Sequence, residues 1–217
     1  EISLGLVGSE MCIRDRYYMP GACSLASHIV LEWIGKPYDT HKLSRDELKG
    51  PEFLKVNPLG AVPALVDGDF ALTQNIAILE YLAEQAPQSK LLGDGSAHSR
   101  ADVRRWLGFI NSDIHKTFSM IFGAQRYLND EGPQRELAAS ASKQLTRLFA
   151  LLDAQLAKKP YLAGAEPSVA DAYLYVVLRW AHAKQVDLSG QDHLAAFFAR
   201  MQENSGVKAA LKAEGLE

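Results

Sequence analysis

The sequence predicts a small α/β domain with a four-stranded sheet, followed by an all-helical domain. Strand and helix patterns alternate in the first part of the chain, which ends with a hairpin and a helix. Residues 87–96 are rich in Pro, Gly, Ser and Asp, as is typical of a linker. From residue 97 onward the apolar residues recur at helical spacing and no convincing strand pattern appears.

The elements of the first domain are predicted in order along residues 17–86. A short strand at 17–19 is stopped by Pro20-Gly21, and a helix at 24–34 carries its apolar residues on one face. The remaining elements are a strand at 38–43, a short helix at 52–56, a hairpin of strands at 61–66 and 70–72, and a helix at about 76–84. Asp67-Gly68 between the two hairpin strands is a tight-turn signal.

The second domain is predicted to occupy residues 97–217 and to consist only of helices. The helical patterns lie at about 98–122, 134–158, 170–184, 193–203 and 207–213. Ser168-x-x-Asp171 precedes the third of them and has the spacing of a capping box, in which the two side chains bond each other's backbone N–H groups. We expect this pair to stabilise the helix and to take no part in chemistry.

Composition and charge exclude several classes of protein. The 217 residues carry 23 Lys and Arg against 26 Asp and Glu, a net charge of −3, so no basic footprint for nucleic acid is present. No apolar run reaches the roughly 18–20 residues that span a bilayer, and we expect no membrane partner. Two cysteines make no disulfide framework, so we expect a cytoplasmic location.

Residues 1–16 are interpreted as a non-native or disordered extension. The apolar run at 2–7 is too short for a signal peptide. Alternating charges at 14–16 come directly before the apolar start of the first strand. We therefore interpret the segment as foreign sequence that stands in place of a few native residues. The alternative is an ordinary disordered extension. Cys12 belongs to it and is given no function.

The segment Pro-Gly-Ala-Cys-Ser at 20–24 brings Cys23 and Ser24 to the start of a predicted helix. The first N–H groups of a helix are unpaired and carry the positive end of its dipole. A thiolate there is stabilised, so the usual cysteine pKa of about 8.5 is expected to fall. The alternative is a small buried Cys23 beside a simple helix cap at Ser24, and the local pattern leaves both interpretations open.

Two further segments have the character of a peptide-binding site. Pro63 opens an apparent strand and has no N–H to donate. If the Val62–Pro63 bond is cis, the backbone of Val62 turns outward and can pair with an extended peptide ligand. Gln74 and Asn75 stand at a helix N-terminus, where N–H groups suit a carboxylate and the Gln74 amide suits an ammonium or a carboxylate. A plain helix cap is the alternative for the last pair.

Together these three motifs resemble the glutathione site of bacterial beta-class glutathione S-transferases, part of the cytosolic glutathione transferase superfamily. The helical half adds matches in the same order at 106–107, 111–116, 168–173 and 179–181. The resemblance covers residues 17–217. It implies a thioredoxin-like N-terminal domain, an all-α C-terminal domain with the electrophile pocket and dimer contacts, and a homodimer. It also implies glutathione as co-substrate, small hydrophobic electrophiles as partners, and no metal.

The resemblance assigns roles to individual residues. Those expected to act at the glutathione sulfur are Cys23, Ser24, Tyr18 and His115. Those expected to bind the rest of glutathione are Val62, Pro63, Gln74, Asn75, Ser112 and Asp113, the last from a neighbouring subunit. Those expected to line the electrophile pocket are Trp180 and Lys116, with a core tryptophan and a solvated lysine as the alternatives. The chain departs from the class at Gln74, where Glu is common, and at Gly108, where Asn is common.

The resemblance implies attack of glutathione thiolate on hydrophobic electrophiles, a detoxification reaction. The first alternative is a glutathione-dependent disulfide or peroxide reductase that uses a mixed disulfide on Cys23. Ala26 stands where a resolving cysteine would lie, so glutathione itself would have to resolve that disulfide. The second alternative is a non-enzymatic binding protein with the same fold.

Overall fold

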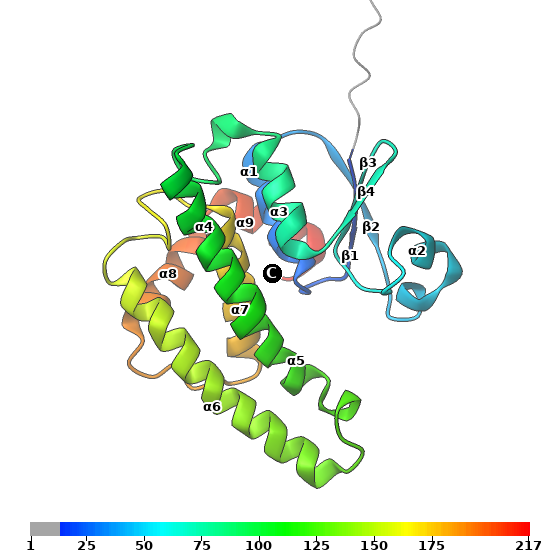
Figure 1. The fold of residues 1–217 in the computed structure, drawn as a ribbon, viewed down its shortest axis with the longest axis vertical. Coiled ribbons are helices and arrows are strands. Elements are labelled where there is room, and N and C mark those ends of the chain that lie inside the picture. Colours follow the sequence, from blue (N-terminus) through cyan, green and yellow to red (C-terminus); the bar gives the residue numbers. More distant parts are fainter. Residues whose placement is uncertain (1–13) are drawn as a thin grey trace, which may run out of the picture.

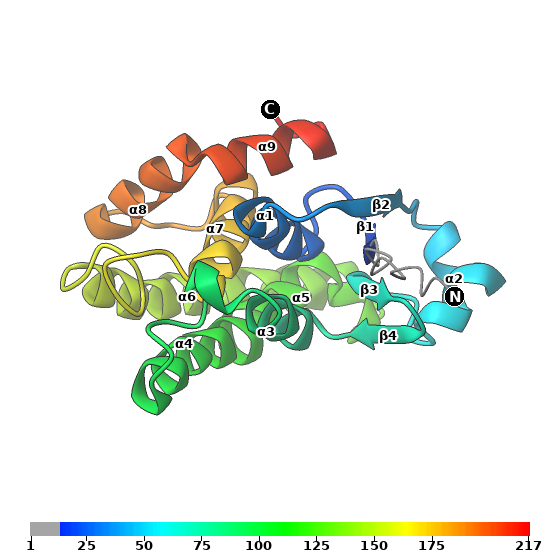
Figure 2. The same ribbon diagram turned by 90° about the horizontal axis from the view of Figure 1, so that it is seen from above.

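The computed structural model describes residues 14–217. Its N-terminal domain contains a four-stranded mixed sheet and three α-helices. Their bounds are β1 Arg14–Tyr18, α1 Ser24–Ile34, β2 Tyr38–Lys42, α2 Pro51–Val56, β3 Ala64–Asp67, β4 Phe70–Thr73 and α3 Asn75–Glu84. The strand order is β2-β1-β3-β4, in which β2 is parallel to β1 and both hairpin strands are antiparallel to their neighbours. The helices α1 and α3 lie on one side of the sheet and α2 on the other (Figure 2).

Two strand boundaries differ from those that the sequence predicts. The first strand begins at Arg14 instead of Tyr17, so the last three residues of the predicted extension belong to the sheet. Residues 1–13 of that extension lie outside the described residues. The strand β3 begins at Ala64 instead of Ala61, because Pro63 cannot donate to a strand ladder and the chain before it is held in a loop.

The C-terminal domain is helical throughout the described residues, as predicted. Its α-helices are α4 Ala97–Phe109, α5 Lys116–Phe122, α6 Glu131–Leu156, α7 Val169–Ala183, α8 Asp192–Glu203 and α9 Ser205–Glu214. The single helix predicted at 98–122 is divided into α4 and α5 by a π-helical stretch at Ile110–His115. Such wider turns are frequent at functional sites. Figure 1 shows α4, α5 and α6 on the outer side of the domain and α7 inside it.

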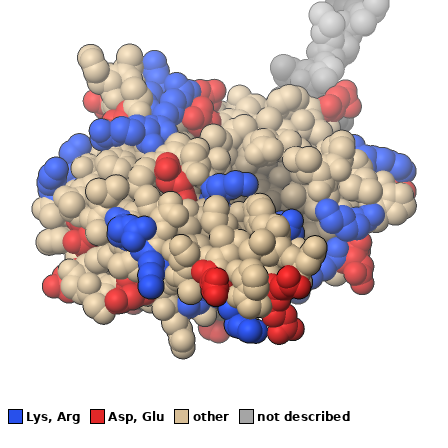
Figure 3. Space-filling view, turned by 60° about the horizontal axis from the view of Figure 1, so that its bottom comes forward, with Lys and Arg blue, Asp and Glu red and all other residues tan. Residues whose placement is uncertain are grey.

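One continuous apolar core joins the two domains. The helix α1 is buried along most of its length and packs on α3 of its own domain and on α7 and α9 of the other. The start of α1 is therefore held by both domains at once. Within residues 14–217, no helix is both long and apolar enough to cross a membrane. Basic and acidic side chains are interspersed on the face shown in Figure 3.

The predicted capping box at the start of α7 is confirmed. The Asp171 carboxylate accepts hydrogen bonds from the Ser168 N–H at 2.8 Å and the Ser168 hydroxyl at 2.9 Å. It also accepts the Leu162 N–H at 2.9 Å, which ties the preceding loop to the helix. Burial raises the pKa of Asp171 to about 6, against the three hydrogen bonds that favour its charged form.

We expect Asp171→Ala to lower the free energy of unfolding by about 2–4 kcal/mol, because it leaves buried N–H donors without acceptors. Urea unfolding followed by circular dichroism measures the change. Asp130→Ala is the matched control, since Asp130 is exposed and its side chain makes no cap hydrogen bond to α6. Equal stability of the two variants would contradict the structural role of Asp171.

Candidate active site

A cavity of about 110 Å³ lies where α1, α3 and the π-helical stretch meet the loop before β3. It brings together six of the residues that the sequence predicts for the site, from four separate segments. These six are Cys23, Val62, Pro63, Gln74, Asn75 and His115. Four further residues that line the cavity are Asn57, Leu59, Ala61 and Asn111. The three motifs that are distant in sequence therefore form one site.

Cys23 stands at the N-cap position of α1, as predicted, but its thiol is not activated in this structure. The Sγ–H donates to the backbone oxygen of Val62 at 3.5 Å. Burial raises the pKa of Cys23 to about 12, although the N–H groups of Cys23 and Ser24 act in the opposite direction. The expectation of a lowered pKa was therefore wrong, because the desolvation cost exceeds the stabilisation by the helix N-terminus. Cys23 is a neutral thiol at neutral pH.

The loop before β3 is built to present its backbone to the cavity. The Asn57 side chain donates to Ala61 O at 2.6 Å and accepts from Leu59 N at 3.1 Å, which closes the loop on itself. Gly60 has φ +58°, and a Cβ there would lie 2.5 Å from Leu48 O, so only glycine fits. The Val62–Pro63 bond that follows is cis, as the sequence argument required.

Gln74 and Asn75 line the cavity from the start of α3. Gln74 has φ +73° and ψ +119°, a conformation that L-residues rarely adopt and that clusters at ligand sites. Asn75 is buried and neither its Nδ2 nor its Oδ1 makes a well-formed hydrogen bond, although its amide lies close enough to the Tyr173 hydroxyl to lower the pKa of that phenol. Buried amides are almost always paired. These two atoms are therefore available to a polar ligand in the cavity.

His115 is held by a short chain of hydrogen bonds that crosses from the π-helical stretch to α7. Its Nδ1 is hydrogen-bonded to the Tyr173 hydroxyl, which in turn donates to Asn111 Oδ1 at 3.2 Å. Burial lowers the pKa of His115 to about 4. The imidazole is therefore neutral at neutral pH, and it faces the same cavity as Cys23.

The turn before Cys23 is held from both sides by the helical domain. Trp180 Nε1 donates to Gly21 O at 2.8 Å, and Glu214 Oε2 accepts from Gly21 N at 3.0 Å. The Trp180 ring also meets His115 edge-on, with centroids 4.9 Å apart, and meets the exposed Phe122 at 5.4 Å. Trp180 therefore joins the thiol turn to an aromatic surface beside the cavity.

Six of the predicted site residues do not line this cavity, and Trp180, which packs beside it, is one of them. Ser24 is buried and donates to Met19 O at 3.4 Å, and Tyr18 packs against His28 and beneath the Arg16 guanidinium. Ser112, Asp113 and Lys116 are exposed on the helix that carries His115. The structure thus separates these side chains from the residues that surround Cys23.

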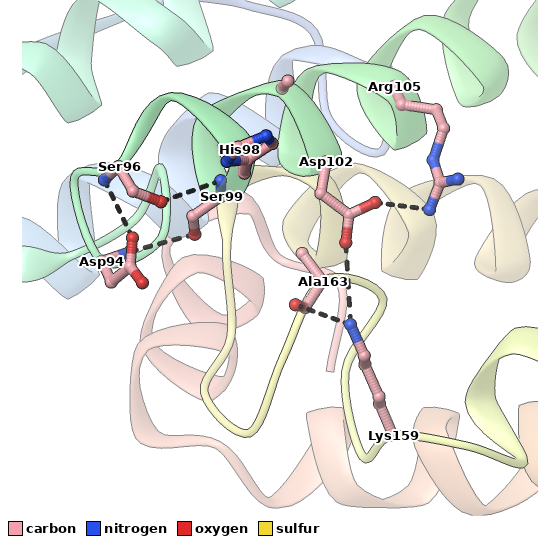
Figure 4. Close-up of a pocket in the computed structure, with 9 residues that line it drawn as sticks. Asp94, Ser96, His98, Ser99, Asp102, Arg105, Lys159 and Ala163 are labelled. Carbon is pink, nitrogen blue, oxygen red and sulfur yellow. Dashed lines mark hydrogen bonds and ion pairs between the residues drawn. The ribbon is translucent and has the colours of Figure 1, made fainter.

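A second, more open hollow lies between the start of α4 and the loop after α6 (Figure 4). Its charged side chains bind one another: Asp102 pairs with Arg105 and with Lys159 at 3.7 Å, and Lys159 also donates to Ala163 O. None of the predicted site residues reaches it. Because its charges are already satisfied, we assign no role to it. In the described residues, no three His, Cys, Asp or Glu side chains gather into a metal site.

Sequence reasoning assigned no site role to Asn57, Asn111, Tyr173 or Glu214. Asn111 lies four residues before His115, so helical spacing alone could have placed both on one face. Asn57 begins the Asn-Pro-x-Gly motif, where a side-chain turn is a known pattern. No local signal identifies Tyr173 or Glu214, because each reaches the site from a distant helix.

Family models match both halves of the chain. The model described as the N-terminal domain of glutathione S-transferase matches residues 21–85, and that for its C-terminal domain matches residues 114–204. A relative from Xanthomonas campestris, named glutathione S-transferase GST-4.5, is 48% identical over 200 residues, which are 92% of this chain and 98% of the relative. The chain belongs to the glutathione S-transferase family.

Solved structures place the chain near the bacterial members of this family. A glutathione S-transferase from Xylella fastidiosa has a TM-score of 0.91 and 48% identity, covering 94% of this chain and all of the other. A bacterial beta-class enzyme from Sphingomonas chungbukensis has a TM-score of 0.83 and 38% identity, with 94% and 100% covered. A sphingomonad glutathione S-transferase complexed with glutathione has a TM-score of 0.82 and 38% identity, with the same coverage. The resemblance to the beta class is confirmed.

We expect Cys23 to react slowly with iodoacetamide, at a rate that still rises with pH above pH 9. At pH 8 a thiol with a pKa of about 12 holds roughly two-thousandfold less thiolate than one at the usual value of about 8.5. Mass spectrometry of tryptic peptides separates Cys23 from Cys12, and the same protein in urea provides the unperturbed rate. A plateau below pH 9 in the folded protein would contradict the neutral thiol.

Proposed function

We propose that the chain conjugates glutathione to small hydrophobic electrophiles, using the cavity around Cys23 as the glutathione site. The observation that carries the proposal is the buried Asn75 amide, which makes no well-formed hydrogen bond and lines one cavity together with Cys23 and Val62. Such a cavity can hydrogen-bond the polar groups of a peptide-like ligand and contact its sulfur through a thiol. Glutathione is a peptide that carries both polar groups and a thiol.

Each wall of the cavity has its own part in binding. The Val62 backbone pairs with the cysteinyl unit, as an added strand would. Gln74 and Asn75 hold the γ-glutamyl carboxylate and ammonium at the N-terminus of α3. The glutathione sulfur then lies at the start of α1, where unpaired N–H groups favour a thiolate. Positioning of this kind supplies much of the rate of a bimolecular reaction.

The high pKa of Cys23 favours conjugation over the redox alternative. A neutral Cys23 thiol can donate a hydrogen bond to a glutathione thiolate, and so stabilise the attacking sulfur. A reductase that cycles through a mixed disulfide needs Cys23 itself as thiolate, which a pKa of about 12 opposes. We place the electrophile against Trp180 and Phe122, whose rings form an apolar surface next to His115.

We further propose that the chain acts as a cytoplasmic homodimer in detoxification. Asp113 is exposed and does not line the cavity of its own chain. In a symmetric dimer it would reach the γ-glutamyl ammonium bound by the partner subunit, where a carboxylate is complementary. Lys116 lies one turn further along the same helix, near the mouth of the electrophile site.

Purified protein is expected to conjugate glutathione to 1-chloro-2,4-dinitrobenzene, measured as product absorbance. The variant Cys23→Ala keeps most of this activity, because glutathione supplies the nucleophile, but it loses the weak glutathione-dependent disulfide reduction that the wild type shows at high pH, where Cys23 begins to ionise. Mass spectrometry of the wild type incubated with glutathione disulfide measures the Cys23 adduct. Equal loss of both activities in Cys23→Ala would make Cys23 essential to conjugation and overturn this division of roles.

Binding to immobilised glutathione separates the enzyme from the non-enzymatic alternative. The wild type is expected to bind and to elute with free glutathione, whereas Asn75→Ala binds roughly tenfold more weakly, because it removes two hydrogen bonds to a charged group. A folded wild type that neither binds nor conjugates would favour the binding-protein alternative.

The shared site is tested by Asp113→Asn. We expect the KM for glutathione to rise roughly two- to fivefold, the value of one partly exposed ion pair, while sedimentation still reports a dimer. Asp192→Asn, on the exposed start of α8, is the control. An unchanged KM in Asp113→Asn, or a monomeric wild type, would exclude a contribution from the partner.

A further inference from the structure

The chain of hydrogen bonds that ends at His115 determines where the protons lie. It consists of Asn111 and His115 on the π-helical stretch and Tyr173 on α7. Tyr173 is fully buried, and burial raises the pKa of its phenol, with the nearby Cys23 sulfur acting in the same direction. The phenol therefore keeps its single proton at neutral pH.

Three side chains lie at the Tyr173 hydroxyl: His115, Asn111, and Asn75, whose amide lowers the pKa of the phenol as a hydrogen-bond donor does. The geometry directs the phenol proton to Asn111. Tyr173 lies 3.2 Å from the side-chain oxygen of Asn111, an atom that can only accept. Once the phenol donates to Asn111, its oxygen can only accept from His115, so Nδ1 must carry the imidazole proton. A neutral imidazole has one N–H, and the pKa of His115, about 4, keeps the ring neutral. The other nitrogen, Nε2, is then an unprotonated acceptor.

We infer that Tyr173 is a positioning residue that holds His115 in the Nδ1–H form and leaves Nε2 free to accept the glutathione thiol proton. The inference rests on the proposed function and adds the base to it. The proton moves from the glutathione sulfur to Nε2, which forms a thiolate beside an imidazolium. Nδ1–H continues to donate to Tyr173, so both N–H groups of the imidazolium have partners. After the thiolate displaces chloride from an aryl chloride, Nε2 releases the proton to solvent.

The pKa of His115 is low when the cavity holds no anion. A thiolate next to the ring favours its charged form and raises its pKa, as in cysteine–histidine pairs. The pKa of Cys23 is raised to about 12, so Cys23 stays a neutral thiol and does not compete for the proton. The two residues thus have separate parts: His115 removes the proton and Cys23 stabilises the resulting sulfur anion.

The test compares Tyr173→Phe with Tyr175→Phe. Tyr175 lies on the same helix, is equally buried, and its hydroxyl has no hydrogen-bond partner, so it matches the loss of one buried phenol oxygen. We expect Tyr173→Phe to lower kcat/KM for 1-chloro-2,4-dinitrobenzene roughly tenfold or more at pH 7. We also expect activity to recover at high pH, where glutathione ionises without a base. Tyr175→Phe is expected to keep the wild-type pH profile.

Nitrogen-15 NMR of the histidines reads the proton position directly, with His115→Gln identifying the signal. In the wild type we expect Nδ1 protonated and Nε2 unprotonated. Asn111→Leu should reverse this, because the Tyr173 proton then turns to Nδ1. An Nε2–H form in the wild type, or a Tyr173→Phe pH profile equal to that of Tyr175→Phe, would overturn the inference. If the wild type does not conjugate glutathione at all, the proposed function fails, while the NMR result still decides the proton position.

Discussion

The structure depends above all on the burial of helix α7. Twelve of its fifteen residues are buried, and a helix that is apolar on all sides is stable only inside a core. Its neighbours include α1 of the first domain, so the two domains share one interior. The capping box at Ser168 and Asp171 determines where this helix begins. The positions of Tyr173 and Trp180 along it follow from that start.

The same packing explains why the candidate site is made of neutral groups. The helix α7 brings Tyr173 to His115 and Trp180 to the turn before Cys23. Exclusion of water raises the pKa of Cys23 and lowers that of His115, so both are uncharged without a ligand. Groups in such surroundings interact strongly with any charge that enters. A glutathione thiolate formed there would therefore meet oriented donors that need little rearrangement.

Much of the fold could be predicted because local patterns specified it. The helix at 24–34 matched residue for residue, since its apolar face and the following Gly35-Lys36-Pro37 define both ends. The start of β1 was missed because alternating charges at 14–16 do not resemble a strand, yet Arg16 is buried against Glu214 of α9. The π-helical stretch was also missed, because a helix that widens by one residue keeps nearly the same apolar pattern.

The sequence likewise predicts one part of the candidate site, and the tertiary structure determines the rest. The motifs around Cys23, Val62 and Asn75 determined by themselves that a thiol, a Val-Pro loop and a helix N-terminus are present, because each depends on neighbours in sequence. Only the tertiary structure decided their chemistry. The pKa of Cys23 depends on how much water its surroundings exclude, and the proton on His115 depends on Tyr173, which is 58 residues away. Burial and long-range hydrogen bonds have no local signature, so they emerge only when the chain is folded.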